Sequence, residues 1–476
     1  MQTQSHPSIE PSQPNRFASD NSIPSLAETL RQRHQTLAEQ INFPVILWSG
    51  RRSSRNFPAN AYPFRASSHF LYFAGLPLHN AVIRLESGKL ELFMDDATPA
   101  DILWHGETAK RDRIAEQIGA DSAYPLARLK SVTEGAATVP VQDAAVCLQQ
   151  SQFLDRLITP ANALQGIDWQ LANAIVHLRL THDAGAIAEI RKAAMVTVQA
   201  HKAGMIATPK AQTEAQVRAA MESVIMANNM TCAYGSIVTV HGEVLHSDRY
   251  HHPLQPNDLL LADVGAEAET GWASDVTRTW AVSGKFSPTQ RAIYDVVLAA
   301  HDRCIEKARP GVEYRELHQV AATTIADGLV DLGILHGRAE DLVEQDAHAL
   351  FFPHGVGHLL GLDVHDMEDL GDLAGYEPGR TRSDRFGWCY LRLDRPLRPG
   401  MAVTIEPGFY QVPALLNDPE RRENYRAMVN WERLEQFADV RGIRIEDDVF
   451  ITTRGCEVLT ADLPTSAEAI EAIVQE

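Results

Sequence analysis

The amino-acid sequence predicts two consecutive domains, an α/β domain at the amino terminus and an α+β domain after it. Between Ile23 and about His182, short apolar strands alternate with helical stretches, which is the rhythm of an α/β domain. Beyond a long helix expected from Ala184, amphipathic helices mix with strands of two-residue period, which indicates an α+β domain. A chain of 476 residues also exceeds what one hydrophobic core ordinarily organises.

The first domain is expected over residues 25–182, after a polar tail over residues 1–24. The tail lacks the basic start and apolar block of a secretory signal. Strands are expected in PVILWSG, AVIRLESGKLELFM and AAVCL, and a helix in TAKRDRIAEQIGA.

The second domain is expected over residues 183–476. Its first helix should run from Ala184 to near Pro209, and a later helix should open with Ser287 as N-cap and Pro288 at the first helical position. Residues 366–396 are rich in charge, glycine and turn formers, so we expect an inserted loop there.

Composition excludes several classes of function. The formal net charge of −19 opposes binding to nucleic-acid phosphates and to anionic lipid. No apolar run approaches the roughly 20 residues that span a bilayer. The five cysteines are scattered and never form a C-x-x-C pair, which argues against a disulfide framework or a thiolate zinc site. We therefore expect a cytoplasmic protein that binds neither nucleic acid nor membranes.

The stretch LLLADVGAEAETGWASDVTRTW, residues 259–280, sets two aspartates in apolar, strand-like surroundings. If the turn is residues 268–270, Asp263 and Asp275 face one another across a hairpin, where like charges are destabilising. Two such carboxylates must share a proton, pair with cations or bind metal. Taken alone, the stretch is explained equally well if one aspartate caps a turn and the other faces water.

Three histidines follow in FFPHGVGHLLGLDVHD, namely His354, His358 and His365. The glycines between the first two, and the absence of a glutamate after His354, exclude the zinc-binding helix H-E-x-x-H. We expect a loop that presents imidazoles to a cleft, although a single histidine is more often an ordinary hydrogen-bonded residue.

Two further strands carry acidic residues. In MAVTIEPGFY, Glu406 ends an alternating strand because Pro407 cannot continue the ladder. In GIRIEDDVFIT, Arg444, Glu446 and Asp448 share one face, which in isolation is an ordinary solvated strand face.

The combination is more specific than any of its parts. Four carboxylates and one imidazole form a mostly hard, oxygen-rich ligand set, which suits two divalent ions of the Mn²⁺ type, with Co²⁺ or Zn²⁺ as alternatives. The charge of two such dications also equals and opposes the charge of four carboxylates. The carboxylates are Asp263, Asp275, Glu406 and Glu446.

The order of the motifs LLLADVG, SDVTRTW, HGVGHLLGLDVHD, TIEPGFY and GIRIEDDV resembles the pita-bread metallopeptidases, and within them the Xaa-Pro aminopeptidases (aminopeptidase P). PFRASSHFLYFAGLPLHNAVIRL is similar to the amino-terminal domain of that family, which has a creatinase amino-terminal, RNase H-like fold. The likeness covers the chain from about Ser25 to its end and implies a pita-bread fold for the second domain.

The resemblance also implies roles for individual residues. Asp275 and Glu446 would contact both metal ions, Asp263 one ion and His358 the other. His246 would stabilise the developing oxyanion, His354 and His365 would line the proline pocket, and Arg444 would orient the carboxylates. The five metal ligands implied are Asp263, Asp275, His358, Glu406 and Glu446.

The activity implied is hydrolysis of the amino-terminal Xaa-Pro bond of peptides, with a metal-bridging hydroxide as nucleophile and Glu406 as proton shuttle. A prolidase, which cuts only Xaa-Pro dipeptides, is the alternative, because the 366–396 loop is somewhat like loops in prolidases. A metal-free creatinase-like hydrolase or a binding protein is a further alternative, disfavoured because all five ligand positions are filled. The extra first domain disfavours methionine aminopeptidase. Relatives are often dimers or tetramers, so a homo-oligomer is expected.

Overall fold

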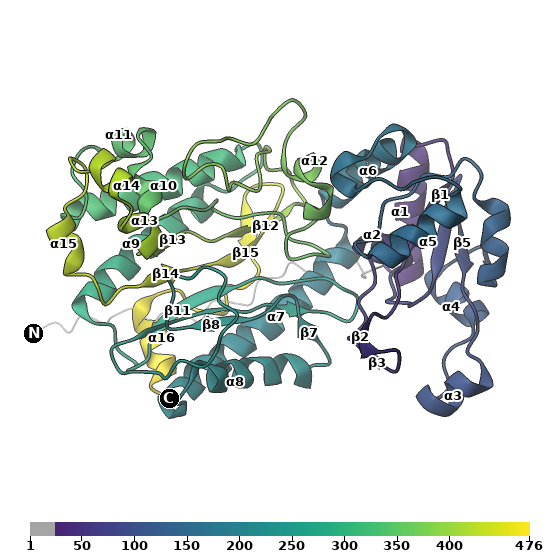
Figure 1. Ribbon diagram of the computed structural model, residues 1–476, viewed down its shortest axis with the longest axis horizontal. Helices are drawn as coiled ribbons and strands as arrows, with labels where there is room; N and C mark the ends of the chain where they lie inside the picture. The colour runs from purple at the N-terminus through teal and green to yellow at the C-terminus, as the bar shows by residue number, and fades with distance from the viewer. Residues whose placement is uncertain (1–23) are drawn as a thin grey trace, which may run out of the picture.

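The structure is a computed structural model that describes residues 24–476. The polar tail predicted over residues 1–24 lies, except for Pro24, outside the described residues. Figure 1 shows two bodies side by side, the first in purple and blue and the second running from teal to yellow. Among the described residues, no helix is long and apolar enough to cross a bilayer.

The first body holds short strands and helices in alternation, as the sequence predicts. Its elements are α1 (Leu26–Gln40), β1 (Val45–Trp48), β2 (Ser54–Phe57), β3 (Asn60–Ala61), α2 (Ser68–Ala74), β4 (Val82–Glu86), β5 (Lys89–Phe93), α3 (Pro99–His105), α4 (Arg111–Ile118), β6 (Ser122–Tyr124), η1 (Leu126–Val132), α5 (Ala144–Leu154), η2 (Ala161–Ala163) and α6 (Gly166–Arg179).

A four-stranded sheet in the order β1-β4-β5-β6 forms the centre of this body. Strand β1 is buried along its whole length, and its successive side chains point to opposite faces of the sheet. Val45 and Leu47 pack into the main core on one face, and Ile46 and Trp48 pack into a smaller cluster on the other. Helices on both faces therefore enclose the sheet (Figure 1).

The prediction of a strand in the segment AAVCL is wrong, because this segment begins helix α5. The side chain of Asp143 accepts hydrogen bonds from the backbone N–H groups of Ala145 and Val146, both at 2.9 Å. An aspartate at this position satisfies donors that a helix start otherwise leaves free, and this capping outweighs the apolar, strand-like composition.

The second body begins with helix α7, whose bounds match the expected long helix. Its elements are α7 (Ala184–Ala207), η3 (Thr208–Lys210), α8 (Glu214–Ala227), β7 (Thr231–Cys232), β8 (Ile237–Thr239), β9 (Leu259–Asp263), β10 (Ala266–Glu267), β11 (Thr277–Ala281), α9 (Pro288–Lys307), α10 (Tyr314–Asp331), α11 (Ala339–Glu344), η4 (Ala347–Leu350), η5 (Glu368–Leu370), α12 (Asp372–Gly375), β12 (Ala402–Ile405), β13 (Gly408–Tyr410), α13 (Pro413–Leu416), α14 (Pro419–Asn424), α15 (Trp431–Glu435), β14 (Gly442–Arg444), β15 (Asp447–Ile451), β16 (Cys456–Val458) and α16 (Ala467–Val474).

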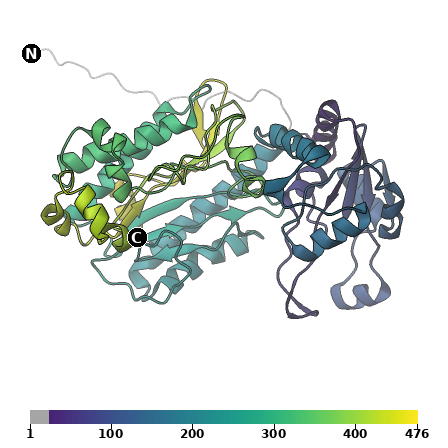
Figure 2. The same cartoon turned by 45° about the horizontal axis from the view of Figure 1, so that its top comes forward.

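Two small antiparallel sheets, β11-β9-β8 and β12-β15-β16, lie in the middle of this body, with the pair β13-β14 beside them. Helix α8 contacts β8, helix α7 contacts β10, and α9 contacts β12, β13 and β14. In Figures 1 and 2 the two helix pairs, α7 with α8 and α9 with α10, lie on opposite sides of the strands. Helix α9 starts with the predicted cap, because Ser287 and Gln290 form a capping box.

The hairpin of β9 and β11 forms, but its register differs from the prediction. Asp263 lies opposite Thr277 rather than opposite Asp275. The three-residue loop lies one residue further along the chain than expected, at residues 269–271, since Ala268 N–H bonds to Trp272 O, and Gly271, its last residue, has a φ of +90°. This glycine conformation is typical of three-residue hairpin loops. Asp263 and Asp275 are therefore diagonal neighbours, which still share one face of the hairpin.

The segment GIRIEDDVFIT is two strands rather than one solvated strand. Strand β14 pairs with β13 and strand β15 with β12, so the pairing partner changes at Ile445 and Glu446. Residues 442–449 are all buried. The predicted loop over residues 366–396 contains the short elements η5 and α12 and otherwise consists of turns and extended chain.

A buried ionic network joins the first body to the loop that carries His365. Arg179, at the end of α6, lies 2.6 Å from Oδ1 of Asp366 and 3.3 Å from Oδ2 of Asp363. It also donates to Nδ1 of His69 at 2.9 Å, and Nε2 of His69 then donates to Asp369 at 3.0 Å. The side chains of Arg179 and Asp366 are only 1% and 2% exposed, so this pair at the centre of the network is shielded from water.

Replacing Arg179 should destabilise the protein strongly, because Arg179→Ala leaves the buried carboxylate of Asp366 without its cation. We expect a loss of about 3 kcal/mol in the free energy of unfolding, measured by urea denaturation. Arg113→Ala is the matched control, since the ion pair of Arg113 with Glu116 is 74% and 69% exposed and should contribute little. Equal effects of the two substitutions would contradict this account of the interface.

Candidate active site

A cavity of about 280 Å³ lies where the β9–β11 hairpin, the loop over residues 353–365 and the ends of β12 and β14 meet. Every residue that the sequence analysis singled out for the site lines it. These residues are His246, Asp263, Asp275, His354, His358, His365, Glu406, Arg444 and Glu446.

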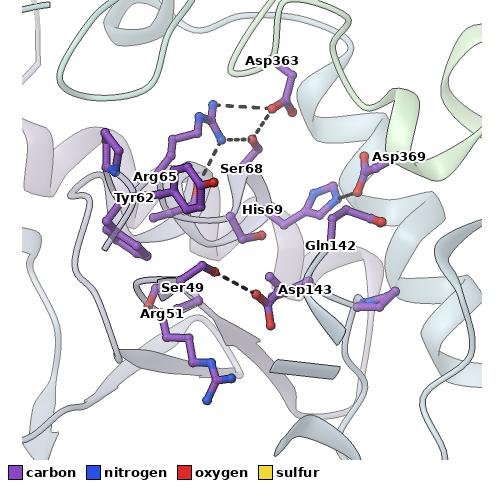
Figure 3. Close-up of a pocket in the computed structure, with 18 of the residues that line it drawn as sticks. Ser49, Arg51, Tyr62, Arg65, Ser68, His69, Gln142, Asp143, Asp363 and Asp369 are labelled. Carbon is purple, nitrogen blue, oxygen red and sulfur yellow. Dashed lines mark hydrogen bonds and ion pairs between the residues drawn. The ribbon is translucent and has the colours of Figure 1, made fainter. Parts of the chain in front are cut away.

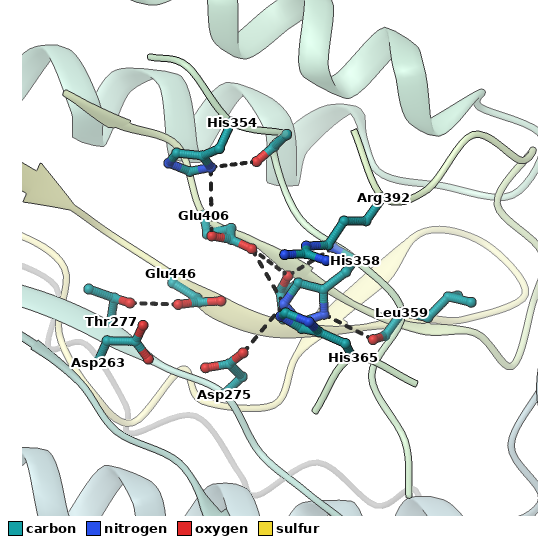
Figure 4. Close-up of polar contacts among 12 residues, drawn as sticks. Asp263, Asp275, Thr277, His354, His358, Leu359, His365, Arg392, Glu406 and Glu446 are labelled. Atoms are coloured by element: carbon teal, nitrogen blue, oxygen red, sulfur yellow. Dashed lines mark hydrogen bonds and ion pairs between the residues drawn. The ribbon is translucent and has the colours of Figure 1, made fainter. Parts of the chain in front are cut away.

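The four carboxylates all lie at strand ends. Asp263 is the last residue of β9, Asp275 precedes β11, Glu406 follows β12, and Glu446 lies between β14 and β15. At these positions the ladder stops, so side chains from different sheets can turn toward one point. Figure 4 shows Asp263, Asp275, Glu406 and Glu446 pointing into the same space.

His358 turns a lone pair toward the carboxylates. Its Nδ1 lies 2.9 Å from the carbonyl oxygen of Leu359, which only accepts, so Nδ1 carries the hydrogen. Nε2 of the neutral ring is then an acceptor, and it lies 3.4 Å from Oδ2 of Asp275 and 3.4 Å from Oε1 of Glu406. An acceptor facing two carboxylates is favourable only if a proton or a cation lies between them.

Arg444 is the buried cation beside this cluster. Its guanidinium donates to Oδ2 of Asp263 at 2.5 Å, to Oγ1 of Thr277 at 2.9 Å and to the hydroxyl of Tyr410 at 3.0 Å. Thr277 in turn donates to Oε2 of Glu446 at 2.6 Å. One arginine thus contacts the carboxylate of Asp263 directly and that of Glu446 through Thr277.

The protonation of the carboxylates reflects their crowding. Burial, followed by the charge of Asp263, raises the pKa of Asp275 to about 7. Burial also raises the pKa of Glu406 to about 7, and burial together with Asp275 holds the pKa of Glu446 well above its usual range. Without a bound cation, a folded state that binds protons this tightly loses stability as pH rises from about 4 to about 7.

The donor set fits a divalent metal. Asp275, His358 and Glu446 each offer a ligand atom, and these three atoms lie within 4.8 Å of one another. Carboxylate oxygens with one imidazole suit ions of the Mn²⁺ type, and such ions would replace the protons that the crowded carboxylates otherwise retain.

The three other histidines lie around this cluster. Nδ1 of His354 donates to Gly355 O at 2.8 Å, and Nε2 accepts from Tyr410 at 2.8 Å, while burial lowers the pKa of His354 to about 3. The ring of His365 lies 4.2 Å from that of His358, and its Nδ1 contacts Glu368 at 2.6 Å. His246 is an exposed residue at the rim of the cavity.

Sequence reasoning missed several residues of the site. The hydroxyl of Tyr234 lies 2.5 Å from Oδ1 of Asp263 and also contacts Oδ1 of Asp275, so it bridges the two aspartates. Tyr390 and Arg392, from the loop over residues 366–396, line the cavity, and Tyr410 links Arg444 to His354. Only Tyr410 carried a local signal, because it lies on the strand that directly follows Glu406 and Pro407.

Two family models match the chain. The model described as metallopeptidase family M24 matches residues 188–453, and the model described as the aminopeptidase P, N-terminal domain matches residues 30–141. The first match spans the body that holds the cavity, and the second lies within the first body.

Several known proteins are similar over most of this chain. A probable Xaa-Pro aminopeptidase of Aspergillus clavatus is 30% identical over 467 residues, which cover 94% of this chain and 97% of that protein. The mitochondrial intermediate cleaving peptidase 55 of Arabidopsis thaliana is 32% identical over 430 residues, covering 87% of this chain and 76% of that protein. The structure of aminopeptidase P from E. coli with the inhibitor Pro-Leu superposes with a TM-score of 0.77 at 29% identity, over 95% of this chain and 99% of that chain.

In this α+β body, carboxylates at the ends of strands surround one imidazole. This arrangement is that of a metal-dependent hydrolase. The chain belongs to metallopeptidase family M24 and carries the amino-terminal domain typical of aminopeptidase P. The predicted fold, an RNase H-like α/β domain followed by a pita-bread domain, and the family resemblance are thereby confirmed.

Metal affinity should depend steeply on pH, because below about pH 7 a divalent cation must displace protons from Asp275 and Glu406. We expect the affinity for Mn²⁺ to fall more than about tenfold from pH 8 to pH 6, with proton release that grows as pH falls. Isothermal titration calorimetry in two buffers of different ionisation enthalpy measures both quantities. Asp275→Asn should release fewer protons, whereas constant affinity without proton release in the parent protein would refute the prediction.

Proposed function

We propose that this protein is a metallo-aminopeptidase that hydrolyses the amino-terminal Xaa-Pro bond of peptides. The observation that carries the proposal is the convergence of four carboxylates and His358 in one cavity, oriented by Arg444. The similarity to Xaa-Pro aminopeptidases over nearly the whole chain supports the choice of substrate.

The metal ligands that we propose are Asp263, Asp275, His358, Glu406 and Glu446, holding two divalent ions, with Mn²⁺ expected and Co²⁺ or Zn²⁺ as alternatives. When bound, such a pair of ions activates water and polarises the carbonyl oxygen of the scissile bond. Arg444 and Thr277 keep the carboxylates of Asp263 and Glu446 in place, so the ligands are arranged before substrate arrives.

Glu406 is suited to move the proton that the reaction requires. Hydrolysis of an Xaa-Pro bond releases the proline nitrogen, which carries no hydrogen in the peptide and must gain one as it leaves. A carboxylate at the edge of the proposed ligand set, 3.4 Å from Nε2 of His358, is placed to accept a proton and to pass it on. Glu406 would take a proton from the attacking water and deliver it to this nitrogen.

The histidines would receive the substrate. His354 stays neutral because of its lowered pKa, and His365 lies against His358, so both can offer ring faces to the apolar proline ring. His246 has no hydrogen-bond partner among residues 24–476 in this structure, and its ring N–H can donate to the developing oxyanion.

The remaining proposals concern the context of the enzyme. The five cysteines are unpaired in the structure, which supports a cytoplasmic location. We further propose domain boundaries at residues 25–182 and 183–476, with the loop 366–396 inserted in the second, and assembly into a dimer or tetramer.

Substrate length separates this proposal from a prolidase. We expect the Mn²⁺-loaded protein to hydrolyse Ala-Pro-Ala with a kcat/KM at least about tenfold above that for the dipeptide Ala-Pro. Chromatography of the released alanine measures both rates. Glu406→Gln, tested in parallel, should lower the rate by about a thousandfold, whereas Glu457→Gln on the surface should not. Hydrolysis of the dipeptide alone would establish the prolidase alternative, and no hydrolysis of either peptide would refute the proposed function.

A further inference from the structure

A second cavity, of about 560 Å³, lies between the two bodies of the molecule. Its walls come from residues 49–51, 53, 62–69 and 140–143 of the first body and from residues 363–365, 368 and 369 of the second. Figure 3 shows these segments around the open space, with Arg51 and Tyr62 from the first body and Asp363 and Asp369 from the second.

This interdomain cavity adjoins the catalytic cavity. His365 lines both cavities, and Glu368, which lines the interdomain cavity, contacts His365 at 2.6 Å. Glu368 also pairs with Arg392, which lines the catalytic cavity. Three side chains, His365, Glu368 and Arg392, thus lie at the boundary between the two cavities.

The acidic side chains in the wall already have partners within the protein. Asp363 pairs with Arg65 and Arg179, and Asp369 pairs with His69. Asp143 caps helix α5 and accepts from Ser53.

Arg65, an arginine that lines the interdomain cavity, also has partners within the protein. It contacts Glu267 at 2.9 Å, Ser68 at 2.7 Å and the carbonyl oxygens of Ala66, Gly271 and Leu362. It therefore has little capacity left for a ligand.

Arg51 is the charged group of this wall that has no ion-pair or hydrogen-bond partner among the described residues. It is exposed and follows Gly50, whose φ of +103° turns the chain out of strand β1. Figure 3 draws no polar contact to its guanidinium. A free guanidinium at the end of a polar cavity is suited to a carboxylate, which it can bind through two parallel hydrogen bonds.

We propose that the interdomain cavity binds the residues that follow proline in a peptide substrate, and that Arg51 binds a carboxylate of that segment. The proposal rests on the proposed function, since an aminopeptidase leaves all residues beyond the scissile bond on one side of the catalytic cavity. With only about 280 Å³ for the residues near the bond, a longer peptide must leave that cavity, and the cavity that shares His365 with it also contains Arg51. Both the terminal carboxylate and an acidic side chain offer the required group.

A ladder of peptides, Ala-Pro-(Ala)n with n from one to five, tests the proposal on the Mn²⁺-loaded full-length protein. Each peptide is assayed with a free carboxyl terminus and with an amidated one, in 0.15 M NaCl. We expect KM to fall about fivefold at the length that brings the free carboxylate to Arg51, and the amidated series to lack this step. An amidated peptide with glutamate as its last residue distinguishes the two sources, because it restores the step only if a side-chain carboxylate also binds.

Arg51→Glu should remove the fall in KM that the peptides with a free carboxyl terminus show. The KM values of the amidated peptides should be the same for Arg51→Glu as for the parent protein. Arg52→Glu is the matched control, because it makes the same charge change one residue away and Arg52 does not line the cavity; the step should persist. Identical length dependence in the parent and in Arg51→Glu would overturn the inference while leaving the proposed function intact. Failure of the parent to hydrolyse any peptide of the ladder would instead refute the proposed function.

Discussion

The concentration of negative charge in one buried cavity is the constraint on which the rest of the second domain depends. Four carboxylates share that space with two guanidinium groups, of which Arg444 binds Asp263 and Arg392 pairs with Glu368 instead. Burial of unpaired charge is costly, and the raised pKa values of Asp275 and Glu406 show that without further cations the cluster retains protons. Divalent ions offset this cost, and the same ions supply the chemistry of a metallopeptidase.

The fold arranges this crowding with little local strain, because each ligand lies where a strand has just ended. The hairpin of β9 and β11 brings two aspartates to one face, while the change of partner between β14 and β15 frees Glu446 from the ladder. The first domain acts at a distance, since Arg179 holds the loop that carries His365. The boundary between the two bodies is therefore close to the chemistry, and it encloses the second cavity.

Many helices and the candidate ligands could be predicted from the sequence, because each depends on residues that are close together in the chain. The start of α9 follows from Ser287 and Pro288, and the ligand motifs each occupy one short stretch. The hairpin register could not be predicted, since it depends on Gly271 adopting a positive φ one residue beyond the expected turn. Tyr234 and Arg392 were missed for a different reason: no spacing pattern relates them to the ligands, and only the tertiary fold brings them to the cavity.

The central claim is that the converging carboxylates and His358 hold two divalent cations. Anomalous diffraction from crystals of the Mn²⁺-loaded protein, collected on both sides of the manganese absorption edge, tests it most directly. The account predicts two manganese peaks roughly 3.5–4 Å apart, enclosed by the five proposed ligands. A map without a peak in this cavity, or with manganese bound only elsewhere on the molecule, would contradict it.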